Sequence, residues 1–138
     1  STKKKPAINS LTSRANSATN RYVDANNRVW YSGNAIFSFN AEDKISGIYS
    51  IKATLNGADI ICRDSDNTIV PNNYVKLGKK VVSKYITVNT ADATNYVEGK
   101  NTLKVTVTGN SGNSITKEIN VFKDTTVPCN YSFSFTNA

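Results

Sequence analysis

The clearest pattern in the chain is a strict alternation of apolar and polar residues in its last third. From Leu103 to Val107 the odd-numbered residues are apolar and the even-numbered ones are Lys or Thr, and the apolar residues between Ile115 and Val121 also share one parity. Because successive side chains of a strand point to opposite faces, each arm has one apolar and one polar face. The segment Gly109–Asn113 between the arms contains residues that tolerate positive φ. The pattern therefore predicts an antiparallel β-hairpin.

The rest of the chain shows shorter apolar segments separated by Gly, Asn and Asp, and no convincing helix. Asn, Ser and Thr make up about a third of the residues, which favours turns and solvated strand faces. The segment Ala91–Val97 is expected to be a loop with at most one helical turn, and the polar stretch Thr12–Asn27 an ordered loop or a short edge strand. Phe37 and Phe39 share one strand face, which we expect to lie in the core. Strands are predicted at Ala7–Leu11, Val29–Tyr31, Ala35–Asn40, Tyr49–Leu55, Asp59–Arg63, Tyr74–Leu77, Val81–Val88, Leu103–Thr108 and Ser114–Phe122.

Several motifs resemble those of bacterial immunoglobulin-like (Ig-like) repeats. The hairpin ends in Asp124–Pro128, which looks like the junction between two extracellular modules. Near the start, the segments Pro6–Leu11, Ile36–Phe39, Glu42–Ile48 and Ile51–Gly57 are similar to the first strands of such a repeat and the Ser-Gly-Ile turn between them. The resemblance implies an all-β, Ig-like antiparallel β-sandwich of about seven to nine strands. It implies a setting in a cell-surface, secreted or phage-virion protein, but no activity, because Ig-like folds share a scaffold rather than a function.

The length of 138 residues suits one domain with a single core. We expect residues 1–5 to be linker, residues 6–123 to form the sandwich, and residues 124–138 to be linker and the first strand of a following module. In that tail, Tyr131–Phe135 alternates aromatic residues with Ser and would suit pairing with a sheet edge or with another copy. No run approaches the roughly 18 apolar residues that a membrane-spanning helix needs. We therefore expect a module of a longer polypeptide with no membrane insertion, whose partners include its neighbouring modules.

The chain is basic, with a formal net charge of +7 and a pI near 9.5. Such a charge suits an anionic partner such as a wall polymer, or simply keeps an Asn-rich surface soluble. Arg14, Arg21 and Arg28 recur every seven residues and could form a local basic face. No nucleic-acid-binding motif is present, so no nucleic-acid partner is expected.

Three aromatic residues close together are the candidate ligand-binding residues. Tyr22, Trp30 and Tyr31 offer flat rings of the kind that contact sugars, with Arg21 and Arg28 beside them. Because Trp30 and Tyr31 point to opposite faces of one strand, we expect one ring to be buried and the other to be available at the surface. The alternative is that Trp30 serves packing alone.

The sequence gives weaker evidence for a metal site and for a disulfide. The segment containing Asp64 and Asp66 resembles the start of a calcium loop, but the glycine and the bidentate glutamate of an EF-hand are missing. A looser β-sandwich Ca²⁺ site or a plain polar turn both remain open, and otherwise no cofactor is expected. Zinc sites are disfavoured because the chain has no His and two widely spaced cysteines. Cys62 and Cys129 either form a disulfide that clamps the tail to the sandwich or remain free thiols.

Catalysis is not expected of this domain. No His is available as a general base, and the neighbouring carboxylates of Glu42 and Asp43 diverge on a strand. The sequence thus predicts a non-catalytic module that acts as a spacer and binds glycan or cell-wall polymer near Trp30. The alternative is a protein-docking or adhesion module that uses sheet edges and the aromatic tail.

Overall fold

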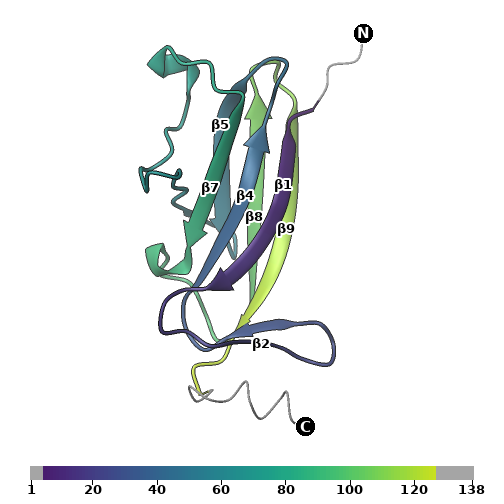
Figure 1. The fold of residues 1–138 in the computed structure, drawn as a ribbon, viewed down its shortest axis with the longest axis vertical. Helices are drawn as coiled ribbons and strands as arrows, with labels where there is room; N and C mark the ends of the chain where they lie inside the picture. Colours follow the sequence, from purple (N-terminus) through teal and green to yellow (C-terminus); the bar gives the residue numbers. More distant parts are fainter. Residues whose placement is uncertain (1–4, 127–138) are drawn as a thin grey trace.

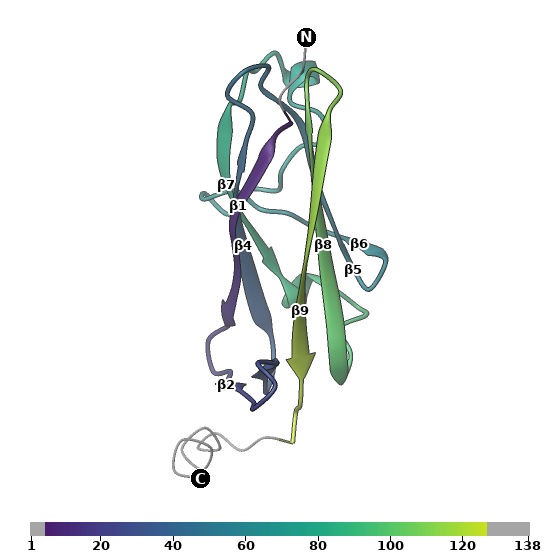
Figure 2. The ribbon, with the colours of Figure 1, turned by 90° about the vertical axis from the view of Figure 1, so that its right-hand side faces the viewer.

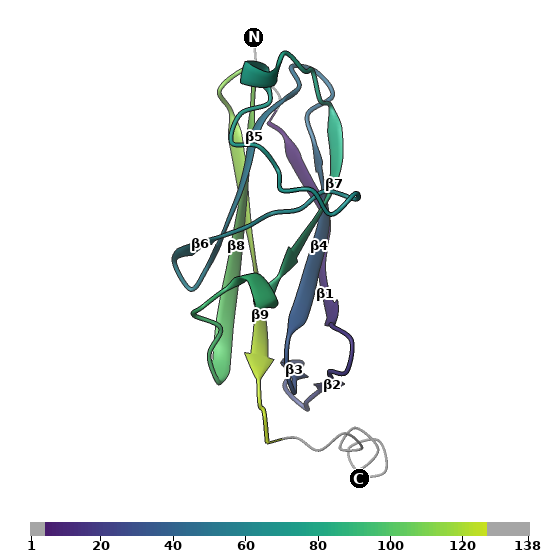
Figure 3. The same cartoon turned by 90° about the vertical axis from the view of Figure 1, so that its left-hand side faces the viewer.

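The computed structural model describes residues 5–126, which form an all-β arrangement of two facing sheets. The first sheet has the strand order β1-β4-β7, and the second has the order β2-β3-β9-β8-β5-β6. Figures 2 and 3 show these two layers side by side along the long axis of the molecule. The strands are β1 (Ala7–Ala15), β2 (Arg21–Val23), β3 (Val29–Tyr31), β4 (Ala35–Glu42), β5 (Ile48–Leu55), β6 (Ala58–Ile60), β7 (Ser83–Asn89), β8 (Gly99–Gly109) and β9 (Ser114–Lys123).

The core lies between the two layers and is built from the alternating apolar positions. In β8, Leu103, Val105 and Val107 are all fully buried, whereas the side chains between them face away from the core. Phe37 and Phe39 of β4 are buried on the facing layer, as the sequence predicted. Burying these rings and aliphatic chains is the main source of stability, at about 1.5 to 3 kcal/mol for each large side chain.

The predicted hairpin is confirmed. Strands β8 and β9 pair antiparallel from Gly99 opposite Lys123 to Thr108 opposite Ser114. The connection is closed by the Gly109 N–H bonded to the Asn113 carbonyl, and Gly112 adopts a φ of 93°, which L residues rarely take.

Other segments differ from the expected boundaries. Tyr74–Leu77 is not a strand, because Val75–Leu77 forms a turn of 3₁₀ helix (η1) that ends at Gly78 with a φ of 68°. A second 3₁₀ turn, η2 (Thr90–Asp92), lies at the start of Ala91–Val97, which agrees with the expectation of a loop with at most one helical turn there. The polar stretch 12–27 contains the short edge strand β2, which was one of the two alternatives expected for it. It also completes β1, which runs beyond the predicted end at Leu11. Residues 12–15 were not recognised as strand because they are polar or small and lie at a sheet edge, where they alternate only between exposed and half-buried positions.

One pair of neighbouring strands is parallel, which differs from the wholly antiparallel sandwich that was expected. β3 pairs with β9 in parallel, with Trp30 opposite Phe122 and Tyr31 opposite Lys123. Figure 1 shows β2 running across the lower end of the molecule, close to the point where β9 ends. The β2–β3 hairpin therefore extends the second sheet only at this end, and its second strand runs in the same direction as β9.

The beginning of the expected C-terminal linker is held against the domain. The Asp124 N–H donates to the Tyr31 carbonyl at 2.9 Å, and the Thr125 N–H donates to the Glu98 carboxylate at 3.2 Å. The first residues of the segment expected to be linker are therefore hydrogen-bonded to the sandwich. The aromatic tail, Tyr131–Phe135, lies outside the described residues.

Candidate functional site: an aromatic row beside Arg28

The β2–β3 hairpin is built around a five-residue loop from Asp24 to Arg28. One oxygen of the Asp24 carboxylate accepts hydrogen bonds from the backbone N–H of Asn26 at 2.8 Å and of Arg28 at 3.0 Å. Asn27 adopts a φ of 61°, a conformation that Asn tolerates better than most residues. The sequence of this loop thus determines its own geometry and sets the positions of the two strands that it joins.

The second oxygen of Asp24 orients two side chains of the site. It accepts a hydrogen bond from the Trp30 indole N–H at 2.8 Å and from Nε of Arg28 at 2.7 Å. Desolvation by the hairpin raises the pKa of the Asp24 carboxyl, but the hydrogen bonds from Trp30, Arg28 and Asn26 outweigh it and hold the pKa well below its usual range. Asp24 is therefore a charged anchor that fixes both a ring and a cation.

Three rings lie in a row across β2, β3 and β9, and we call Tyr22, Trp30 and Phe122 the aromatic row. Tyr22 and Trp30 are cross-strand partners with ring planes within 5° of parallel and centroids 6.1 Å apart. Trp30 and Phe122 are partners in the next pair, with centroids 5.0 Å apart. All three side chains are partly exposed, while their chain neighbours Tyr31 and Val121 are buried. The aromatic row therefore lies on the outer face of the second sheet.

Cationic groups flank the aromatic row. The Arg28 guanidinium carbon lies 6.0 Å from the Trp30 ring centroid and 5.8 Å from that of Phe122. Lys100, the β8 partner of Phe122, is exposed on the same face. Rings of this kind offer flat apolar contact to a sugar, and the adjacent cations offer hydrogen bonds and charge to an anionic group.

The structure separates the predicted site residues into two groups. Trp30 is the partly exposed ring of its pair and Tyr31 is fully buried, which confirms that only one of the two is available at the surface. Tyr31 is therefore wrong as a ligand contact: its hydroxyl lies 2.8 Å from Ser13 Oγ and accepts a hydrogen bond from Nε of Arg21 at 3.3 Å. Arg21 shares the face of Tyr31, its cross-strand partner, and so lies on the opposite face from Trp30.

The seven-residue spacing of Arg14, Arg21 and Arg28 does not produce one basic face. Arg28 lies over the aromatic row, Arg21 contacts Tyr31, and Arg14 belongs to β1 in the other sheet. A period of seven would align side chains on a helix, but these residues lie on three segments with different directions. Phe122 is the member of the site that sequence reasoning missed. The sequence did contain a signal for it. Phe122 is the chain neighbour of Val121, so the two side chains point to opposite faces of the strand, and Val121 belongs to the apolar face.

The predicted calcium candidates form a turn like the one in the β2–β3 hairpin. Asp64 accepts hydrogen bonds from the backbone N–H of Asp66 at 2.9 Å and of Thr68 at 3.0 Å, and Asn67 has a φ of 62°. Between residues 5 and 126 no three His, Cys, Asp or Glu side chains gather in a way that could hold a metal ion. The arrangement of Asp64 follows from its role in closing the loop.

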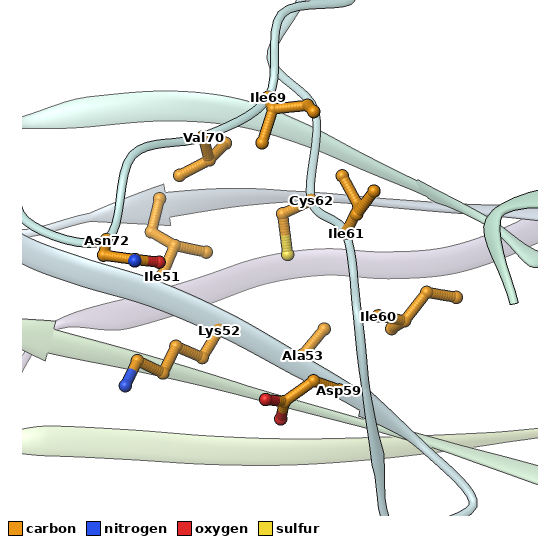
Figure 4. Close-up of a pocket in the computed structure, with 10 residues that line it drawn as sticks. All are labelled: Ile51, Lys52, Ala53, Asp59, Ile60, Ile61, Cys62, Ile69, Val70 and Asn72. Carbon is orange, nitrogen blue, oxygen red and sulfur yellow. The ribbon is translucent and has the colours of Figure 1, made fainter.

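A hollow, shown in Figure 4, lies beside β5 where the chain that follows β6 leaves it. Its volume is about 500 Å³, and its walls include the buried Ile60 and Val70 and the more exposed Ile61 and Ile69. Cys62 also lines it, and desolvation of this buried side chain raises the pKa of its thiol to about 12. Cys129 lies outside the described residues, so the disulfide stays a prediction.

The fold and the aromatic row together define an all-β, two-sheet protein with a surface cluster of rings and cations. Comparison with protein families, with curated proteins and with solved structures found no match for this chain. Among residues 5–126, no helix has the length and apolar character needed to cross a membrane.

The low pKa of Asp24 leads to a prediction about pH. A carboxyl whose pKa is lowered in the folded state adds stability that is fully present above its unfolded value of about 4 and is lost as the pH falls below it. We expect the stability difference between the natural protein and Asp24→Asn to be constant from pH 7 to about pH 4 and to shrink below that pH. Urea unfolding followed by Trp30 fluorescence measures this difference. A stability difference that already declines between pH 7 and pH 5 would contradict a lowered pKa for Asp24.

Proposed function

We propose that the protein is a non-catalytic Ig-like module of a larger extracellular bacterial or phage protein, serving as a spacer that binds glycan or anionic wall polymer through the aromatic row. The strand orders support the Ig-like part of this proposal. The order β1-β4-β7 corresponds to strands A, B and E of an Ig sandwich, and β9-β8-β5 corresponds to G, F and C. The motifs at residues 6–57 and 124–128 point to the same class.

One observation carries the binding part: an ordered row of rings on an outer sheet face, with the cation of Arg28 fixed beside it. Apolar and aromatic residues on the second sheet otherwise point mainly into the core, and its outer face along β8 and β9 bears Thr, Lys, Asn and Glu. Asp24 already holds Trp30 and Arg28 in place, so a ligand need not order them on binding. Pre-ordering of this kind lowers the entropic cost of association.

The test uses Tyr22→Ala, because this change removes a ring from the row and leaves Trp30 as the fluorescent reporter. A panel of neutral glycans and anionic wall polymers is titrated while Trp30 emission is recorded. We expect saturable quenching by at least one polymer and binding about tenfold weaker in Tyr22→Ala, which corresponds to about 1.4 kcal/mol.

Tyr49→Ala is the matched control, since Tyr49 is 41% exposed on β5 and lies outside the aromatic row. Its binding should equal that of the natural protein, and both variants should show the natural melting temperature to within a few degrees. Equal losses in the two variants, or no quenching by any polymer, would overturn the binding proposal and leave the spacer role alone.

The alternative is a docking module, and the apolar hollow of Figure 4 is the observation that favours it. Ile69 is 54% exposed at its edge, which suits an apolar side chain from a neighbouring module of the same polypeptide. The two functions give different NMR results. A polymer bound at the aromatic row shifts the signals of Trp30 and Tyr22, whereas a docked module shifts those of Ile61 and Ile69.

A further inference from the structure

A polar pocket opens on the outer face of the first sheet, which is the layer opposite the aromatic row. Its volume is about 410 Å³. The backbone brings its residues from five separate places: β1, β4, the connection between β6 and β7, β7 itself, and η2. The polar residues that line it are Arg14, Arg63, Asn67, Thr87, Asn89 and Asp92, and we call it the arginine pocket.

Strand pairing explains how two arginines 49 positions apart come to line one pocket. Arg14 of β1 is the partner of Ile36 of β4, and Ile36 is in turn the partner of Asn89 of β7. On the far edge of β7, Arg63 forms a pair of backbone hydrogen bonds with Thr87, each 2.9 Å long. The pocket thus spans three strands and the segment that covers the edge of β7.

Arg63 is held in a fixed orientation with donors to spare. Its Nε donates to one Asp92 oxygen at 3.1 Å and its Nη2 to the other at 3.3 Å, while Nη1 donates to the Asn67 carbonyl at 3.2 Å. A guanidinium has five N–H groups, so these bonds leave two of them available. Because its planar guanidinium is already held in one orientation, Arg63 suits a planar oxyanion as a partner.

Arg14 supplies the net charge of the pocket. Asp92 is already paired with Arg63, and no carboxylate in residues 5–126 lies within ion-pair distance of Arg14. The hydroxyl of Tyr85 lies close enough for its pKa to be lowered, first by a hydrogen bond with Ser38 and then by the positive charge of Arg14. The three charged groups therefore sum to one positive charge, which favours one negative charge in a ligand.

We propose that the arginine pocket binds a sugar unit that carries a carboxylate group. The carboxylate lies between the free donors of Arg63 and the guanidinium of Arg14. The sugar hydroxyls bond to the amide of Asn89 and the hydroxyl of Thr87, and Ile36 contacts the ring. A volume of this size holds roughly 14 waters at about 30 Å³ each, which is comparable to the number of heavy atoms in a hexuronate.

The proposal does not depend on the aromatic row, which lies on the other sheet, and it is tested with its own probes. The full chain, labelled with ¹⁵N, is titrated with glucuronate, with glucose as the neutral counterpart, and with inorganic phosphate as an anion without a sugar ring. We expect saturable shifts of the Asn67, Thr87 and Asn89 amides with glucuronate, and binding at least tenfold weaker with glucose and with phosphate.

Arg14→Gln removes the unpaired charge and should weaken glucuronate binding at least tenfold. Arg21→Gln is the matched control, because it removes the same charge from a position outside the pocket, and its affinity should stay within twofold of the natural protein. Equal losses in the two variants would show general attraction to a basic surface and overturn the proposal. Glucose or phosphate binding as tightly as glucuronate, or no saturable shift, would also overturn it.

Discussion

Replacing Asn101 with aspartate is expected to lower the free energy of unfolding by about 4 kcal/mol at pH 7, because the change places an unpaired charge in the interior. Asn101 is fully buried at the start of β8. Its amide nitrogen donates to the carbonyls of Val97 at 2.8 Å and Gly99 at 3.0 Å, so a carboxylate at this place would face two carbonyl oxygens. Its oxygen accepts from Val97 N–H and from Asn56, bonds that a carboxylate would keep.

Urea unfolding measures this loss of stability. The dependence of the loss on pH shows whether it comes from the buried charge or from a side chain that fits its place poorly. The deficit should shrink as the pH falls towards about 4, where the introduced carboxyl becomes protonated and can donate again. Asn120→Asp makes the same chemical change at an exposed position of β9 and should cost less than about 0.5 kcal/mol. A deficit for Asn101→Asp that is independent of pH would show that charge is not the reason.

Gly109→Ala is expected to cost about 3 kcal/mol of stability, because the added methyl group would overlap a buried carboxylate. The Cβ of any larger residue at position 109 would meet Oδ2 of Asp43. Asp43 cannot move aside without loss, since it is 5% exposed and accepts hydrogen bonds from the backbone N–H and the hydroxyl of Ser46 at 2.9 and 3.0 Å. The β4–β5 and β8–β9 turns therefore pack through this contact.

Gly112→Ala separates this steric cost from backbone strain. Gly112 has a φ of 93° but no atom within 4 Å of its added Cβ, so its replacement should cost only about 1 kcal/mol. In the double variant Gly109→Ala with Asp43→Ala, the two losses should not add, because the second change removes the overlap. Thermal unfolding of the natural protein, Gly112→Ala, the two single variants of the pair and the double variant tests both expectations, and additive losses in the pair would exclude the overlap as the cause.

Local patterns in the sequence were sufficient for much of the secondary structure. The period-2 alternation from Leu103 to Val107 predicted β8, and the Gly-rich segment after it predicted the turn to β9. Both depend on interactions between residues close in sequence. The same is true of the hairpin loop at Asp24, whose carboxylate bonds to the backbone two and four residues later. Tyr74–Leu77 was mistaken for a strand because three apolar side chains in four residues fit a short strand as well as a turn.

The sequence by itself determined an all-β chain with two-faced strands, and it identified Trp30 and Tyr31 as a pair of which only one could be exposed. Only the tertiary structure decided which one, because the choice depends on β3 lying beside β9 with Tyr31 turned to the core. It likewise placed Phe122 next to Trp30 and Arg63 in one pocket with Arg14. The two residues of each pair are 49 or more positions apart in the sequence. They come together because whole sheets bury their apolar faces, and no local preference of the chain specifies these contacts.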